Sequence, residues 1–162
     1  MSVSRSLPTG VAAGRVDHAP KPGPRHAQLN AIIGHWITEG HIINADGSPG
    51  AKILASDVYE WAPGGFFVLH SAYGFIGDVG AGGVEMIGYV ASDAYRIHFF
   101  DSLGNVTRHE LTIRNHTWIW QGEFTRCTSV FSEDYRTQTA HHERTDDGAN
   151  WVASMHVVLR KV

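Results

Sequence analysis

The feature that most constrains this chain is the even spacing of short strand-like segments from residue 35 to the end. Ten segments rich in Val, Ile, Thr, Tyr, Phe or Trp alternate with turn sequences such as Pro63-Gly64-Gly65 and Asp147-Gly148. The links are too short for the crossovers that parallel strands need, so neighbouring strands must be antiparallel. The predicted strands cover residues 35–44, 52–61, 66–74, 83–90, 95–102, 106–114, 116–122, 125–132, 136–145 and 151–161.

An even number of antiparallel strands can close into a barrel by pairing the first strand with the last, which removes exposed sheet edges. We therefore predict an all-β, closed, ten-stranded antiparallel up-and-down barrel with an interior wide enough for a small ligand. A β-sandwich is the alternative. Apolar residues at helical spacing from His26 to Ile33, followed by Gly34, predict a short helix at one end. Residues 1–24 are expected to be a flexible tail, and residues 25–162 the barrel domain.

Composition excludes several classes of protein. A net charge of −3 over 162 residues provides no positive field for nucleic acid, and no apolar run is long enough to span a membrane. Cys127 is the single cysteine, so no intramolecular disulfide can form, which favours the cytoplasm. No histidine partner for Cys127 is apparent in the sequence, and we expect the thiol to pack in the core.

The two ends of the predicted barrel carry a recognisable pair. Gly34-x-Trp36 at the first strand and Arg160 near the end of the last strand resemble the calycin arrangement. That resemblance implies an inward Trp36 covered by Arg160, as a stacked cation–π pair.

Four segments in order resemble a bacterial family of lipocalin-like barrels, domain of unknown function 1579. The resemblance extends over residues 29–162 and implies the barrel fold, but it brings no activity with it. The segments are YEWAPGGFFVLH at 59–70, GVEMIGY at 83–89, HFFDSLGN at 98–105 and DGANW at 147–151.

Histidine is unusually frequent, with 11 residues. Antiparallel partners have residue numbers of constant sum, so turn positions predict which side chains meet. This places His70 opposite Met86 or Ile87, Ile87 opposite His98, and His98 opposite His109, forming one row of histidines. A register error of one residue would move the row to the outer wall. A buried His70 also needs hydrogen-bond partners, for which a Tyr or Glu85 is a candidate.

His156 lies four residues before Arg160 and shares its face, so it points inward if Arg160 covers Trp36. A distant resemblance to nitrobindin-type barrels, which hold haem iron through a histidine of the barrel wall, makes His156 an alternative haem ligand. Otherwise we expect no metal and no cofactor.

These patterns predict binding of a small, largely hydrophobic ligand in the barrel, without nucleic-acid or membrane partners. An enzyme that uses His70, His98 and His109 for acid–base chemistry, of isomerase, cyclase or hydrolase type, is the alternative, and haem or metal binding is the second. Outer residues such as Ile37 could form a homodimer contact. The predicted ligand-binding residues are Trp36, Tyr59, Phe67, His70, Tyr73, Met86, His98, Trp118, Trp120, His156 and Arg160.

Overall fold

Ten antiparallel strands close into one barrel in the computed structural model, which describes residues 19–90 and 94–162. Each strand pairs with its neighbours in sequence, and β1 pairs with β10 to close the sheet. The predicted barrel is thus confirmed, and the β-sandwich alternative is wrong. The strands are β1 (Gly34–Ile43), β2 (Pro49–Trp61), β3 (Phe67–Ile76), β4 (Val79–Val90), β5 (Ala94–Asp101), β6 (Val106–Arg114), β7 (Thr117–Gln121), β8 (Thr125–Phe131), β9 (Thr137–Arg144) and β10 (Val152–Lys161).

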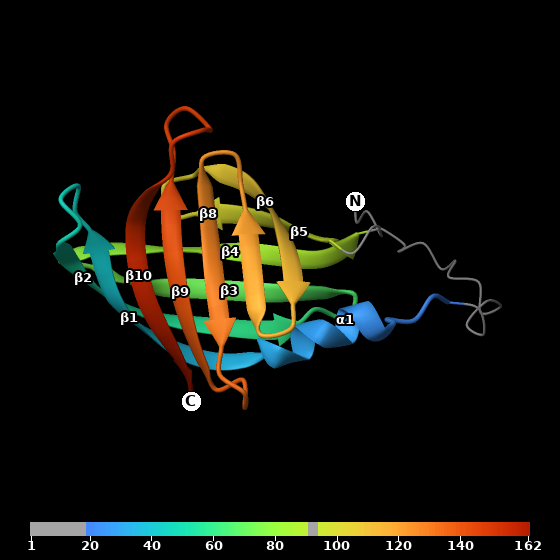
Figure 1. Cartoon of the computed structure of the whole chain (residues 1–162). Helices are drawn as coiled ribbons and strands as arrows, with labels where there is room; N and C mark the ends of the chain where they lie inside the picture. The colour runs from blue at the N-terminus through green and yellow to red at the C-terminus, as the bar shows by residue number, and fades with distance from the viewer. Residues whose placement is uncertain (1–18, 91–93) are drawn as a thin grey trace, which may run out of the picture.

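The barrel has two walls whose strands cross steeply. Strands β2, β3 and β4 run across the back of the molecule in Figure 1, behind the steeply inclined β8, β9 and β10. Strand twist has this effect when a sheet closes on itself, because strands on opposite sides tilt in opposite directions. Inward and outward side chains alternate along every strand, so register decides which residues reach the interior.

A short helical segment lies across one end of the barrel, as the sequence predicts (Figure 1). Helix α1 (Pro24–Gln28) continues into a 3-10 turn, η1 (Leu29–Ala31). Leu29 and Ile32 are fully buried, and the Trp36 indole Nε1 donates a 2.7 Å hydrogen bond to the Ile32 carbonyl. The Tyr95 hydroxyl donates to backbone and side-chain oxygens of the helix, which ties it to β5. The segment therefore seals this end of the apolar core.

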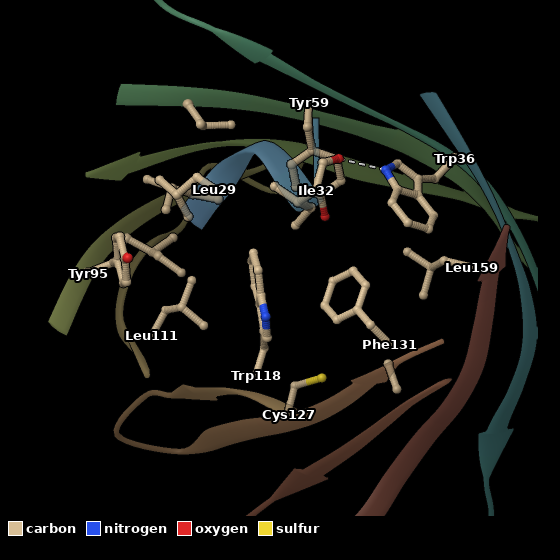
Figure 2. Packing of buried hydrophobic residues seen from close by; sticks show 14 of the residues in the cluster. Leu29, Ile32, Trp36, Tyr59, Tyr95, Leu111, Trp118, Cys127, Phe131 and Leu159 are labelled. Carbon is tan, nitrogen blue, oxygen red and sulfur yellow. Dashed lines mark hydrogen bonds between the residues drawn. The ribbon is translucent and has the colours of Figure 1, made fainter. Parts of the chain in front are cut away.

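Large aromatic side chains fill the interior beside this helix. Figure 2 shows Trp118 and Phe131 projecting from their strands between the helix and the far wall. Their ring centroids lie 4.8 Å apart, and Phe131 also meets Trp36 edge to face. Rings packed at these angles stabilise the core beyond the area that they bury.

Residues 1–18, which make up most of the predicted tail 1–24, and residues 91–93 lie outside the described residues. The expected tail, and the boundary of the barrel domain at residue 25, stay predictions. Within residues 19–90 and 94–162, no helix is long and apolar enough to cross a membrane.

Candidate functional site

A chain of charged and polar side chains crosses the inner face of four adjacent strands. His70 of β3 lies between two carboxylates, with Nε2 2.9 Å from Asp57 Oδ1 and Nδ1 2.8 Å from Glu85 Oε2. The Thr38 hydroxyl donates to the other oxygen of Asp57. All of these side chains are largely shielded from solvent, and we call Thr38, Asp57, His70 and Glu85 the polar chain.

Register explains how these residues meet. His70 pairs directly with Glu85 across β3 and β4, and with Tyr59 across β2 and β3. The Tyr59 ring stacks on the imidazole with centroids 3.8 Å apart and planes 7° apart. Asp57, two residues before Tyr59 on the same inner face, reaches His70 diagonally, which is within the span of neighbouring antiparallel strands.

The two carboxylates determine the charge of His70. Burial lowers the pKa of this imidazole, but hydrogen bonds to Asp57 and Glu85 outweigh it, and the pKa rises to about 9. His70 is therefore an imidazolium at neutral pH, and both of its nitrogens donate to carboxylates. Burial, followed by the charges of Asp57 and Glu85, raises the pKa of the Tyr59 phenol well above its usual value, so this group stays neutral.

A second pair, Cys127 and His142, lies on β8 and β9. Cys127 Sγ is 3.4 Å from His142 Nε2, so the expectation that the thiol has no histidine partner is wrong. Burial lowers the pKa of His142 to about 4, and burial with the nearby charge of Glu85 raises that of Cys127 to about 12. Both groups are neutral at pH 7, so this pair is not the thiolate–imidazolium pair of a cysteine nucleophile.

Three buried polar atoms inside the barrel have no hydrogen-bond partner among the described protein atoms. They are Trp118 Nε1, Gln138 Nε2 and His109 Nδ1. Gln138 uses its oxygen to accept from the Ser129 hydroxyl, and His109 uses Nε2 with the Thr125 hydroxyl. Such atoms are uncommon in folded proteins, and each needs an explanation.

The predicted row of three histidines does not form. His98 pairs with Met86 and Arg108 on the outer wall, whereas His109 pairs with the buried Ile97. The observed pairing differs from the predicted sum by one or two residues at the turn after β3 and by one residue at each of the next two turns, and one residue reverses the face. His70 does face inward and bonds Glu85, one of the partners expected for it.

The prediction that Arg160 covers Trp36 is also wrong, because the covering cation is Lys161. Lys161 lies over the fully buried Trp36, with Nζ 4.8 Å from the ring centroid, and it donates a 3.0 Å hydrogen bond to the Ala31 carbonyl. Arg160 points outward and pairs with Glu39. Adjacent residues of a strand face opposite sides, and Trp36 pairs with Lys161, so the cation on the inner side belongs to Lys161.

His156 shares the face of Arg160 and is therefore exposed on the outer wall. Its ring stacks on His141 at 4.2 Å, and His41 is its partner on β1. His156 cannot serve as a haem ligand within the barrel, so the residue proposed to hold haem does not fit that role. Over residues 19–90 and 94–162, no group of three or more His, Cys, Asp or Glu side chains is placed to hold a metal ion.

The remaining predicted ligand-binding residues divide by face. Tyr59, Trp118 and Trp120 belong to the inner wall or pack against its core. Phe67, Tyr73 and Met86 are 46, 63 and 43% exposed on the outer wall and cannot line the interior.

Sequence reasoning missed Asp57, His142 and Gln138 as interior groups. Asp57 alternates with Ile53 and Tyr59 along one face of β2, and this alternation could have located it, because a carboxylate on an apolar face needs a partner. His142 and Gln138 have no comparable signal, since polar residues occupy both faces of β9.

Comparison with known proteins agrees with this architecture. A model of the family "Protein of unknown function (DUF1579)" matches residues 21–161. The chain belongs to the DUF1579 family. No curated protein matches this DUF1579 member. A solved structure, the crystal structure of Rv2717c from M. tuberculosis, resembles it with a TM-score of 0.64 and 9% identity, over 86% of this chain and 98% of the other. At this identity the likeness concerns the fold.

Proposed function

We propose that this DUF1579 barrel binds a small, largely apolar molecule in its interior, beside the polar chain. The observation that carries this proposal is the group of buried polar atoms without protein partners. Two of them, Trp118 Nε1 and Gln138 Nε2, are N–H donors on side chains that are 1 and 3% exposed. An N–H group buried without an acceptor costs about 1–3 kcal/mol, which a bound acceptor would recover.

The surroundings define the chemistry of the ligand. Trp118 packs against Phe131 (Figure 2) and also against Trp120, so its N–H lies among flat aromatic surfaces. Ligand sites combine apolar walls with a few placed polar groups in this way. We therefore propose a ligand with a flat apolar body and a neutral acceptor, such as a carbonyl oxygen. The carboxylates of Asp57 and Glu85 disfavour an anion.

Acid–base catalysis by the predicted histidines is less well supported. His70 has both nitrogens bonded to carboxylates and His98 lies outside the barrel, so of the three only His109, through its unpaired Nδ1, keeps a free nitrogen inside. A general base needs a free nitrogen within reach of a substrate proton. We therefore propose that His70 orders the two carboxylates at the inner wall and exchanges no proton with a ligand.

The test uses 6-propionyl-2-dimethylaminonaphthalene, a neutral fluorescent probe with a flat apolar body and a carbonyl acceptor. We expect saturable binding with blue-shifted emission. Trp118→Phe keeps the aromatic body but removes the N–H, and it should weaken binding about two- to tenfold, as for one net hydrogen bond. Gln138→Leu should act in the same direction.

Trp151→Phe is the matched control, because Trp151 lies outside the barrel core beneath the Arg126 guanidinium. It should leave probe binding unchanged. Absence of saturable binding, or equal binding by the Trp118 and Trp151 variants, contradicts the proposal.

A further inference from the structure

The outer faces of β3 and β4 carry no charged residue. Residues that alternate outward on an antiparallel sheet facing water are usually polar. Here they are Phe67, Leu69, Ser71, Tyr73 and Phe75 on β3, with Gly80, Gly82, Val84, Met86 and Gly88 on β4. We call these ten residues the β3–β4 face. An outer face without charged residues is typical of a sheet that is also covered on that side.

The apolar surface continues onto the neighbouring strands. Val84 pairs with Phe100, which pairs with Val106, and Phe75 pairs with Leu54. Glycines on β4 let the aromatic rings lie close to the sheet: a Cβ added at Gly88 would come within 2.5 Å of the Phe67 ring. The result is a broad apolar platform.

The outer surface of β1, β10 and β9 differs in character. Glu39 and Arg160 form an ion pair across β1 and β10, and His41, His156 and, on β9, His141 are also exposed there. The absence of charge from the β3–β4 face is therefore a local property of that wall and does not extend around the barrel.

The area of the platform is large for a free surface. Four aromatic and five aliphatic side chains are 39–63% exposed there, namely Phe67, Tyr73, Phe75, Phe100, Leu54, Val58, Val84, Met86 and Val106. With about 200 Å² for a whole aromatic side chain, they present roughly 750 Å² of surface. The largest apolar patch of a typical monomer is about 300–600 Å², and a standard interface buries about 800 Å² per partner.

We propose that the β3–β4 face is the interface of a two-fold homodimer of this chain. Oppositely charged residues at one end of the face favour a second copy as the partner. Lys52 and Asp78 line a groove of about 400 Å³ together with Leu54, Phe75 and Gly77. A two-fold axis parallel to β3 brings the β3 strands of the two copies face to face. It also brings β2 of each copy over β4 of the other. Lys52 of each copy then meets Asp78 of its partner, as an isologous interface requires.

The closed barrel also determines how two copies can associate. Within residues 19–90 and 94–162 every strand is paired on both sides, so none of these strands offers a free edge that could extend the sheet into a second molecule. Association must be face to face, in the manner of two packed sheets. This interface is independent of ligand binding inside the barrel.

Sedimentation velocity of the full chain between 1 and 100 µM tests the proposal. The wild type should sediment as a dimer of the 17.8 kDa chain. Val84→Lys should raise the dissociation constant at least about 100-fold, because it places a charge in the apolar centre. Val130→Lys is the matched control: Val130 is 47% exposed and Val84 45%, but Val130 lies on β8. It should remain dimeric.

Charge exchange tests the two-fold arrangement itself. Lys52→Asp and Asp78→Lys should each weaken the dimer, and the double variant should restore it, since the ion pairs are re-formed with reversed sign. A monomeric wild type at 100 µM overturns the proposal, as does a dimer that persists in Val84→Lys. Co-flotation of a monomeric wild type with phosphatidylcholine and phosphatidylglycerol vesicles would also overturn it, and would assign the face to a membrane.

Discussion

The imidazole of His70 lies flat on the ring of Tyr59, with the ring planes 7° apart. Stacking fixes the ring orientation, and the two carboxylates of Asp57 and Glu85 occupy its nitrogens. The interior of the barrel thus contains a fixed positive charge held by two negative ones. This arrangement makes the stability of the protein depend on pH in a defined direction.

Stability should fall in alkaline solution through His70. Its pKa is about 9 in the folded protein and 6.5 when exposed, so the folded state retains a proton that the unfolded state loses. The stabilisation is fully present below pH 6.5 and is lost as pH rises through 9, by about 3 kcal/mol. Urea unfolding at pH 6 and 9.5 measures it. His70→Gln should lack this loss, whereas His41→Gln, on the exposed outer wall, should keep it.

Stability should fall in acid through His142. Burial lowers its pKa to about 4, so the unfolded state binds more protons below pH 6.5. This contribution is therefore lost as pH falls from 6.5 towards 4, and it amounts to about 2 kcal/mol between pH 7 and 5. In urea unfolding, the free energy of unfolding of His142→Phe should fall by about 2 kcal/mol less than that of the wild type between pH 7 and 5. Equal acid sensitivity of variant and wild type would show that His142 is accessible to protons when folded.

Lys161 should contribute more to stability than its neighbour Arg160. Lys161→Met removes both the cation over Trp36 and a hydrogen bond to the Ala31 carbonyl, and should lower the free energy of unfolding by about 1–2 kcal/mol. Arg160→Met removes an exposed ion pair and should change the free energy of unfolding by less than about 0.5 kcal/mol. Denaturant titrations of both variants measure the difference. A larger loss for Arg160→Met than for Lys161→Met would favour Arg160 as the cation that covers Trp36, as the calycin resemblance implies.

Cys127 should be inert in the folded protein. Burial and the charge of Glu85 raise its pKa to about 12, and only the thiolate reacts with disulfide reagents. Reaction with 5,5′-dithiobis(2-nitrobenzoate) at pH 8 should be slower than in the urea-unfolded protein by about 10³-fold. His142→Phe should not accelerate it, because His142 is neutral. Rapid labelling of the native wild type would mean that Cys127 is a reactive thiolate in the folded protein.

The sequence predicted the barrel well because its signals are local and repeated. Turn residues such as Pro63-Gly64-Gly65 and alternating strand patterns locate each element within a few residues, and closure follows from an even number of strands. The same local signals also predicted the helix at the barrel end.

The inner wall was harder to predict because it depends on single residues of register. His98 lies outside because β4 pairs with β5 as Ile87 with Ile97, one position from the predicted pairing. Arg160 and Lys161 are adjacent cations, and sequence alone does not tell which one faces Trp36. The link from Asp57 to His70 joins diagonal positions on neighbouring strands, which a count of opposed pairs does not reveal.

The most direct test of interior binding is the indole N–H signal of Trp118 in ¹H–¹⁵N correlation spectra, assigned with Trp118→Phe. On titration with 6-propionyl-2-dimethylaminonaphthalene, it should move downfield and saturate with the fluorescence, because its free N–H gains an acceptor. The Trp151 signal should stay in place. A stationary Trp118 signal at saturating probe, or shifts confined to indoles outside the barrel, would contradict ligand binding inside it.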